Sequence, residues 1–297
     1  MNVGRLGVAY QRFRHSDRET RAFLLSRWAG RALSSAAKPL YFLAAVLLRV
    51  ALIALKPIVH VRFGRMYSHA MGIWTVSLES YLCERDAGVQ PTHTRDVFYH
   101  YNADRSMLKH PPKSKDQACN RQLNLMFSRE LHISQFGAAL DRLNRMLPKG
   151  SENFIVKVPS SCDQTGVMDP FPPHLTFTEE EEQRGSSGLR GLGVEPGSKF
   201  ICFHARDKGY VAQFAPRWVS LYGDWADGSH RNAAISNQVL AAQKLTELGY
   251  YTIRMGKYVE DPVHSDDPRI IDYAYESHDD FMDVYLSAHC TFLIGGN

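Results

Sequence analysis

The hydrophobic pattern separates an apolar N-terminal stretch from a longer body. The stretch Leu40–Leu55 is apolar except for Arg49, and Lys56-Pro57 ends it. From His60 onward, short apolar runs typical of buried strands alternate with segments whose apolar residues recur at helical spacing. Strands that alternate with helices along the chain predict an α/β fold with a largely parallel sheet.

The same pattern gives bounds for the expected elements. Apolar runs that end at polar residues or glycine predict strands, and apolar residues three and four positions apart predict helices. The predicted strands are Val59–Phe63, Val97–Tyr101, Lys199–Arg206, Tyr250–Met255, Ile270–Ala274 and Thr291–Ile294. The predicted helices are Ile73–Cys83, Asn120–Glu130, Phe136–Met146, Ala233–Leu248 and a short one capped by Asp280.

A glycine-rich segment divides the body into two halves. Thr178 followed by Glu181 is a capping box, so the acidic run there is the first turn of a helix and not a metal site. The glycines that follow, up to Pro196-Gly197, predict a loosened join. The predicted domains are an arm over 1–58, an N-terminal α/β domain over 59–195 and a C-terminal α/β domain over 196–297.

The end of the sequence is unusual for a parallel sheet. Gly295-Gly296-Asn297 follows the last predicted strand directly. A central parallel strand needs a crossover helix, and this tripeptide is typical of the turn into one. We therefore expect the C-terminal domain to be truncated.

Charge distinguishes the arm from the body. Up to Arg65 there are 12 Lys and Arg residues against Asp17 and Glu19, a net charge of +10, and the remainder carries −6. A basic arm on a mildly acidic body argues against nucleic-acid binding and favours an anionic membrane surface as partner. The apolar stretch is shorter than the ~20 residues that a membrane crossing needs. We expect a helical arm that lies on the inner face of the cell membrane; a true span and a buried core helix are the alternatives.

The cysteine pattern is typical of a protein in a reducing compartment. The chain has five, an odd number without any C-x-x-C pair. This pattern predicts neither a disulfide framework nor a zinc site, so we expect a cytoplasmic protein without a metal cofactor.

Candidate chemistry gathers at the predicted strand ends. His204 and Arg206 lie two residues apart at the end of one strand, Arg254 and Gly256 end the next, and Gly295–Asn297 ends the last. Ligands of open α/β sheets bind at these carboxyl ends. Guanidinium forks match phosphate oxygens, and glycines let a diphosphate approach backbone N–H groups. The set suits a nucleotide-diphosphate leaving group.

Each part of this set also has a structural explanation. An H-x-R pair can be a solvated strand end, and a Gly-Gly pair can be a simple turn. Arg254 could pair with Asp272 or Asp280 for stability alone. Only the placement on three strand ends favours a binding site.

Six motifs, in order along the chain, carry a resemblance to a known family. They are Phe200–Tyr210, Arg231-Asn232, Tyr251–Gly256, Ile270–Ala274, Asp280–Asp283 and Phe292–Asn297. With them the chain resembles one family of bacterial glycosyltransferases of the GT-B architecture, with a donor site akin to that of fucosyltransferase-like enzymes. Val61–Gly88 and Asn120–Leu131 resemble that family more loosely.

The resemblance implies two Rossmann-like half-domains and a nucleotide-diphosphate sugar as donor. It implies that Arg206 contacts the β-phosphate of the donor. The acceptor would be a glycan or another hydroxyl compound, in bacterial surface glycan or polysaccharide synthesis. The residues that would line the donor pocket are His204, Arg206, Asp207, Arg231, Asn232, Arg254, Gly256, Gly295, Gly296 and Asn297.

The acceptor side needs a general base if the transfer inverts. Gly64 and Gly72 bracket a predicted loop, and His69 within it is the candidate, with Glu79 and Asp86 behind it. The alternative is an exposed loop histidine. Two other function classes stay open: a non-catalytic nucleotide-sugar-binding module and a membrane-associated assembly protein.

Overall fold

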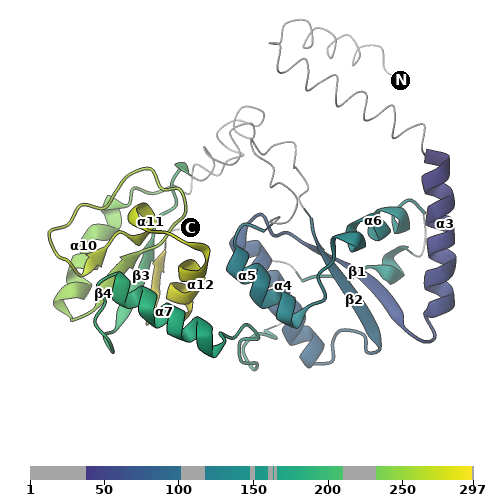
Figure 1. The fold of residues 1–297 in the computed structure, drawn as a ribbon, viewed down its shortest axis with the longest axis horizontal. Coiled ribbons are helices and arrows are strands. Elements are labelled where there is room, and N and C mark those ends of the chain that lie inside the picture. The colour runs from purple at the N-terminus through teal and green to yellow at the C-terminus, as the bar shows by residue number, and fades with distance from the viewer. Residues whose placement is uncertain are drawn as a thin grey trace, which may run out of the picture. The chain divides into compact units, whose positions relative to one another are not determined.

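The structure is a computed structural model that describes residues 38–101, 118–147, 151–159, 163, 166–209 and 232–295 (Figure 1). The chain divides into two compact units. The first comprises 1–63, 93–95 and 136–156, and the second comprises 64–92, 96–135 and 157–297. These units do not coincide with the boundaries after residues 58 and 195 that the sequence predicted.

Helix α3 (Lys38–Leu55) forms the described part of the arm. Ala45 and Leu52, two turns apart, are buried, and Arg49 Nη2 donates to the backbone oxygen and Oδ1 of Asn144, each at 3.0 Å. The opposite side of the helix exposes apolar side chains. They are Leu40, Leu43, Leu47, Val50 and Ile53. Among the described residues, no helix combines the length and apolarity that a membrane crossing requires.

The first sheet pairs β1 (His60–Met66) with β2 (Thr94–His100). His60 N donates to His93 O, and Tyr101 N donates to Met66 O, so the two strands run in parallel. Helix α4 (Met71–Asp86) connects them and buries Trp74 and other residues of one face. Helices α5 (Arg121–Glu130) and α6 (Gln135–Asn144) and the 3₁₀ turn η2 (Ser151–Phe154) follow β2.

The second sheet has the strand order β5-β4-β3-β6, and all its pairs are parallel. Its strands are β3 (Phe200–His204), β4 (Tyr251–Arg254), β5 (Ile270–Ile271) and β6 (Leu293–Gly295). The chain adds strands on one side of β3 and then places β6 on the other side. The topological switch point of this α/β sheet therefore lies between β3 and β6.

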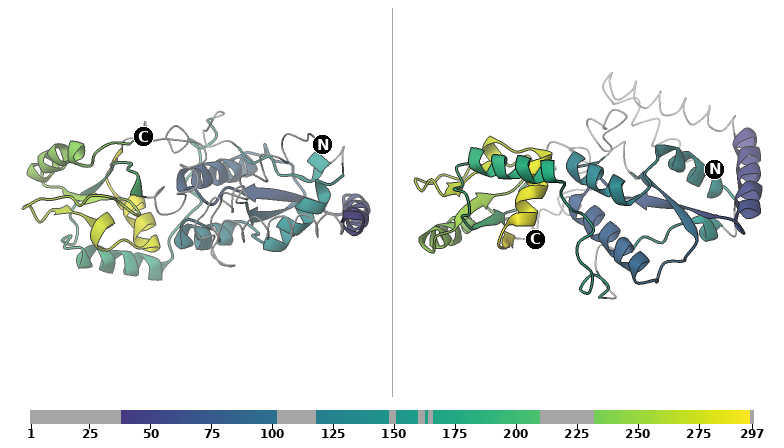
Figure 2. Two further views of the ribbon diagram at one scale, coloured as in Figure 1. Left: turned by 90° about the horizontal axis from the view of Figure 1, so that it is seen from above. Right: turned by 60° about the horizontal axis from the view of Figure 1, so that its bottom comes forward.

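Helices cover both faces of this sheet (Figure 2). Side chains such as Cys202 face α7 (Glu179–Gly191), α11 (Tyr273–Glu276) and α12 (Asp280–His289), whereas Ile201 and Phe203 face α10 (Ser236–Glu247). This alternation follows from the two-residue period of a strand. The parallel α/β architecture predicted from the sequence is confirmed.

Several expected bounds were wrong. Gly64 lies inside β1 and Gly72 lies inside α4, so the predicted loop shrinks to residues 67–70. Only Ile270–Ile271 of the run up to Ala274 is strand, because Asp272 is the N-cap residue of α11. Asp279, and not Asp280, caps α12, through hydrogen bonds from Phe281 N and Met282 N.

The expectation that Gly185 and Gly188 loosen the chain was also wrong. Gly185 and Gly188 lie inside α7, and a Cβ atom on either would overlap the ring of Tyr285 or the sulfur of Met282. The glycines therefore let α7 approach α12 closely instead of loosening the chain. The capping box at Thr178 and Glu181 is confirmed.

Candidate functional site

The ends of three strands lie side by side on the second sheet. Parallel pairing places His204 beside Gly295 and Phe203 beside Arg254. The ends of β4, β3 and β6 therefore meet at one edge, where ligands of open α/β sheets bind. The sequence predicted this convergence.

His204 has a defined orientation at the end of β3. Its Nδ1 lies 3.1 Å from the backbone oxygen of Met255. A carbonyl oxygen only accepts, so Nδ1 carries the proton and donates. In the neutral imidazole, Nε2 is then left as the acceptor.

A cavity of about 290 Å³ opens beside His204. All its lining residues belong to the second compact unit. They are Ala70, Met71, Cys119, His204, Ala205, Arg206, Asp207, Gly256, Lys257 and Val259. Two cationic side chains, Arg206 and Lys257, thus border the same space as His204.

The N-terminus of α4 borders this cavity too. Ala70 is its N-cap residue and has no side-chain acceptor for the first-turn N–H groups. Unpaired amides at a helix start carry a partial positive charge and bind anions. The helix start and Arg206 contribute positive potential to this site, and Lys257 adds a cation that is ion-paired with Asp280.

Asp207 has a local structural task. Its Oδ1 accepts from Gly209 N at 2.9 Å, and its Oδ2 accepts from Glu260 N at 3.0 Å. The carboxylate thus joins the loop after β3 to the loop after β4. It fixes the backbone that presents Arg206.

Gly256 is required by its backbone. Its φ is +152°, a region that other residues rarely adopt, and a Cβ atom would lie 2.9 Å from Val259 Cγ1. Any other residue would strain the turn after β4 and narrow the cavity.

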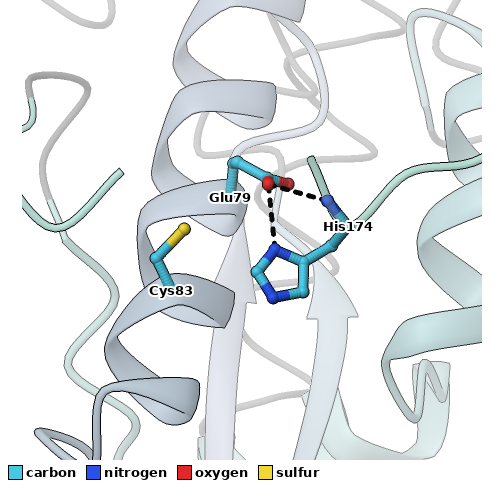
Figure 3. Close-up of side chains that lie close together, drawn as sticks. All are labelled: Glu79, Cys83 and His174. Atoms are coloured by element: carbon cyan, nitrogen blue, oxygen red, sulfur yellow. Dashed lines mark hydrogen bonds and ion pairs between the residues drawn. The ribbon is translucent and has the colours of Figure 1, made fainter. Parts of the chain in front are cut away.

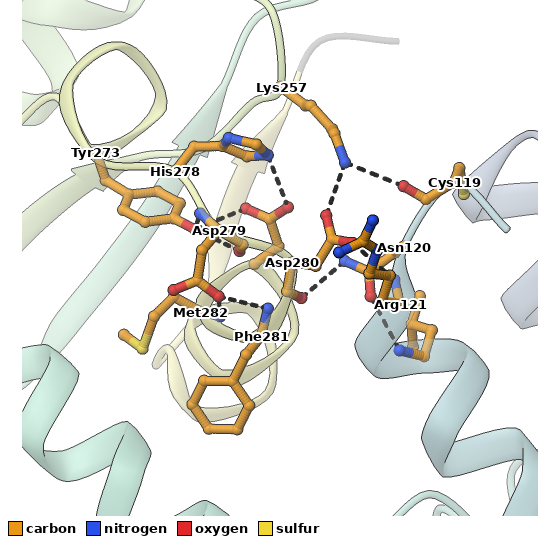
Figure 4. Close-up of polar contacts among 12 residues, drawn as sticks. Cys119, Asn120, Arg121, Lys257, Tyr273, His278, Asp279, Asp280, Phe281 and Met282 are labelled. Atoms are coloured by element: carbon orange, nitrogen blue, oxygen red, sulfur yellow. Dashed lines mark hydrogen bonds and ion pairs between the residues drawn. The ribbon is translucent and has the colours of Figure 1, made fainter. Parts of the chain in front are cut away.

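Lys257 links the loop after β4 to α12 and to the start of α5 (Figure 4). Its Nζ donates to Asp280 Oδ1 at 2.7 Å and to the backbone oxygen of Cys119 at 3.2 Å. Asp280 Oδ2 also accepts from Arg121 N at 2.8 Å. Burial would raise the pKa of Asp280, but its bonds to Lys257 and Arg121 lower the pKa overall. Asp280 is therefore an anion at neutral pH.

Cys119 contributes no reactive thiolate to the cavity. Burial raises the pKa of its thiol to about 11, against a smaller opposing effect of Lys257. The thiol is therefore neutral at pH 7, and only a thiolate is a strong nucleophile.

Arg254 is not a cation available to the cavity beside His204. Its side chain is 1% exposed, and Nη1 donates to Asp272 Oδ2 at 3.1 Å and to the backbone oxygen of Asp261. The structural pairing with Asp272, raised as the alternative from sequence, is the one the structure shows. Arg254 braces the loop between β4 and β5.

Arg254 also borders a second cavity of about 230 Å³ on the α10 side of the same edge. Asn232, Lys208 and Glu260 are among its other lining residues. Asn232 Oδ1 is buried and accepts no hydrogen bond from any residue that the structure describes. A buried acceptor without a donor is costly, so a ligand or a water molecule would satisfy it.

The remaining predicted site residues are not brought into the first cavity. His69 contacts the ring of Tyr67 and does not line either cavity, although Ala70 and Met71, which follow it, do. Glu79 and Asp86 both bond to His174. Arg231, Gly296 and Asn297 lie outside the described residues.

Comparisons with known proteins give little further guidance. No protein-family model matches the chain, and no curated protein matches it in sequence. Among solved structures, it is similar to E. coli ADP-heptose LPS heptosyltransferase II, with a TM-score of 0.41 and 11% identity over 80% of this chain and 79% of that one. A likeness at this level establishes neither a shared fold nor a shared activity.

Sequence reasoning missed two contributors to the cavity, Lys257 and Cys119, and it interpreted the start of α4 as part of a loop. Lys257 follows Gly256 directly, so its place after a strand-end glycine was a usable signal. Cys119 carries no comparable signal, because only the tertiary fold brings it to the end of β3.

Proposed function

We propose that this chain is a glycosyltransferase that binds the diphosphate of a nucleotide sugar at the carboxyl end of β3. The observation that carries the proposal is one cavity bordered by His204, Arg206 and Lys257, by the strand-end glycine Gly256 and by the uncapped start of α4. The Arg206 guanidinium and the N–H groups at the start of α4 favour a negative charge, and Gly256 leaves the backbone open to a phosphate.

The chemistry of a sugar transfer suits this arrangement. Negative charge grows on the diphosphate as the glycosidic bond breaks, and donors fixed in advance stabilise it. The Arg206 guanidinium can hold two phosphate oxygens at once, and α4 offers backbone N–H groups. Side-chain cations supply the positive charge in this proposal, so it includes no metal ion.

The finer assignments are part of the same proposal. The donor is a nucleotide-diphosphate sugar, the acceptor is a glycan or another hydroxyl compound, and the architecture is of the GT-B type. His69 is the proposed general base, since it directly precedes Ala70 and Met71 at the cavity. Asn232 and the second cavity are proposed to hold part of the nucleoside, because the buried Asn232 Oδ1 lacks a donor among the described residues.

We also propose that the arm holds the protein on the cytoplasmic face of a membrane. The exposed apolar side of α3 would enter the interface, and the basic residues that precede it would attract anionic lipid.

A panel of nucleotides tests the donor site. GDP, UDP and ADP, each with and without an attached sugar, are added to the protein and its melting temperature is measured. A ligand at 100 times its Kd should add about 2.7 kcal/mol to the free energy of unfolding. If no nucleoside diphosphate raises the melting temperature at millimolar concentration, the proposed donor site is wrong.

Turnover distinguishes an enzyme from a binding module. Release of the nucleoside diphosphate from a stabilising sugar donor, in the presence of glycan acceptors, is expected of a transferase. Stabilisation without any release would favour the non-catalytic module. Neither stabilisation nor release would favour the assembly protein.

A further inference from the structure

A second group of reactive side chains lies away from the cavity, between α4 and the segment that precedes α7. It consists of Glu79, Cys83 and His174 (Figure 3). Glu79 and Cys83 are four residues apart, so they share one face of α4. One ligand atom from each of the three lies within 4.8 Å of the other two.

His174 is held from both sides of its ring. Nδ1 lies 2.9 Å from Glu79 Oε1, and Nε2 lies 3.0 Å from Asp86 Oδ2. The backbone N–H of His174 also donates to Glu79 Oε1, at 3.0 Å. The ring therefore presents Nδ1 to Glu79 and Cys83 while Asp86 fixes its other nitrogen.

We propose that Glu79, Cys83 and His174 bind a zinc ion. A carboxylate, a thiolate and an imidazole are the three ligand types that zinc takes in proteins. In many zinc sites, the ring nitrogen of histidine that does not bind the metal donates a hydrogen bond to a carboxylate. Asp86 corresponds to that carboxylate, because it contacts His174 Nε2. It is a positioning residue and not a ligand.

The geometry needs only small adjustments to admit the ion. Bonds of ~2.0 Å to nitrogen and oxygen and ~2.3 Å to sulfur put tetrahedral ligands roughly 3.3–3.6 Å apart. The Glu79–His174 pair, at 2.9 Å, must open slightly, and the sulfur of Cys83, which lies within 4.8 Å of both partners, must move inward by at most about 1.5 Å.

In the metal-free protein, the Cys83 sulfur and His174 Nδ1 carry protons at the positions where they would bind the ion. Burial and the Glu79 carboxylate raise the pKa of the Cys83 thiol. Burial lowers the pKa of His174, but the bonds to Glu79 and Asp86 outweigh burial and raise the pKa overall. Binding would break the S–H bond and the Nδ1–H bond, form the two metal bonds and release both protons to solvent.

The other acidic group of comparable shape does not carry the same proposal. His278, Asp280 and Asp283 also come within 4.8 Å of one another. Asp280 is already neutralised by Lys257, and the group has no thiol. The thiol of Cys83 makes the first group distinctive and gives it a spectroscopic signature.

The site has a structural consequence for the second compact unit. His174 lies in the segment between Gly166 and Thr178, which leads into α7, and Glu79 and Cys83 lie on α4. A bound ion would hold that segment on α4 more strongly than the three hydrogen bonds of His174 do. Zinc should therefore raise the melting temperature of the protein.

Cobalt substitution tests the proposal on the full chain under reducing conditions. Co²⁺ reports a thiolate ligand by a sulfur-to-metal charge-transfer band. We expect one equivalent of Co²⁺ to produce the band, and Zn²⁺ to displace it. Cys83→Ser and His174→Gln should each abolish it, whereas Cys290→Ser and His278→Gln should retain it.

Two further measurements keep the test decisive. Asp86→Asn should weaken Zn²⁺ binding roughly 10- to 100-fold while leaving the stoichiometry at one, as expected for a group that orients a ligand. If Cys83→Ser does not fold, His174→Gln decides the matter, because its side chain lies in a loop outside the α4 core. Absence of the band in the unsubstituted protein, or its persistence in Cys83→Ser or in His174→Gln, would overturn the proposal.

Discussion

At the residue scale, two arginines at strand ends have different surroundings. Arg254 is enclosed by Asp272 and by a backbone oxygen, and it stabilises a loop. Arg206 follows His204 by two residues in the sequence, and both border the same cavity. The donor-site proposal therefore depends on Arg206 and not on Arg254.

Replacing Arg206 with Lys should separate charge from geometry. The substitution keeps the positive charge but loses the planar fork, so donor attraction should change little. Turnover should fall by roughly 10²-fold, or about 2.7 kcal/mol, which is typical of removing one fixed transition-state donor. Steady-state kinetics measure it. Arg190→Lys, at an exposed position near the end of α7, is the control, and unaltered turnover in Arg206→Lys would contradict the assignment.

Asp283 should make stability depend on pH. Burial raises the pKa of its carboxyl to about 7, against ~3.9 in an unfolded chain. Between these values the folded protein holds a proton that the unfolded chain lacks, so the free energy of unfolding falls as pH rises from about 4 to 7. Asp283→Asn still accepts the hydrogen bond from the Tyr273 hydroxyl and removes this titration.

Urea unfolding of both proteins at pH 4.5 and 7.5 provides the measurement. The asparagine variant should gain stability relative to the unsubstituted protein as pH rises. Asp266→Asn, at an exposed position, is the matched control. If Asp283→Asn and the unsubstituted protein show parallel pH profiles, Asp283 is ionised in the folded state.

At the scale of elements, glycine has two opposite meanings in this chain. In the turn after β4, Gly256 provides a positive φ. In α7, Gly185 and Gly188 have no such role. Because they lack a Cβ atom, α7 can pack directly against side chains of α12. A list of glycines alone does not distinguish a flexible join from a tight helix contact.

Gly185→Ala tests this contact. Alanine favours a helix by up to about 1 kcal/mol over glycine, so an isolated helix would gain stability. Here the new methyl group would overlap the ring of Tyr285, and overpacking of this kind costs roughly 1–3 kcal/mol. We expect net destabilisation in chemical unfolding. Gly191→Ala, where a Cβ atom has no neighbour within 4 Å, should be neutral or stabilising, and equal behaviour of the two variants would refute the contact.

At the scale of the whole molecule, the arm is the part with an unexplained apolar surface. Deleting residues 1–56 would remove the buried Ala45 and Leu52 and the bonds of Arg49, so loss of binding after deletion would be ambiguous. Substitutions on the exposed side of α3 avoid this problem.

The double variant Leu43→Glu and Leu47→Glu should release the protein from anionic vesicles. Both side chains are exposed, and two charges on the apolar side oppose entry into the interface. Co-sedimentation measures the bound fraction. Leu240→Glu with Leu248→Glu makes the same charge change at exposed leucines near or on α10, and binding should be retained. Equal retention by both double variants would show that α3 does not carry the interaction.

The sequence by itself determined the features that depend on neighbouring residues. The alternation of apolar runs and helical periodicity predicted the parallel α/β architecture, and the second sheet confirms it. Thr178 and Glu181, three residues apart, predicted their own capping box. His204 and Arg206 were placed at a strand end, because side-chain direction there follows from the two-residue period.

Only the tertiary structure decided which side chains meet. Arg254 and Asp272 are 18 residues apart, and the intervening loop sets their pairing. Glu79 and His174 form a hydrogen bond although they are 95 residues apart, and Lys257 donates to the backbone oxygen of Cys119, which is 138 residues away in the sequence. Local sequence patterns report secondary structure because its hydrogen bonds are local. Contacts at long range depend on how the elements pack, and a one-dimensional pattern does not contain that packing.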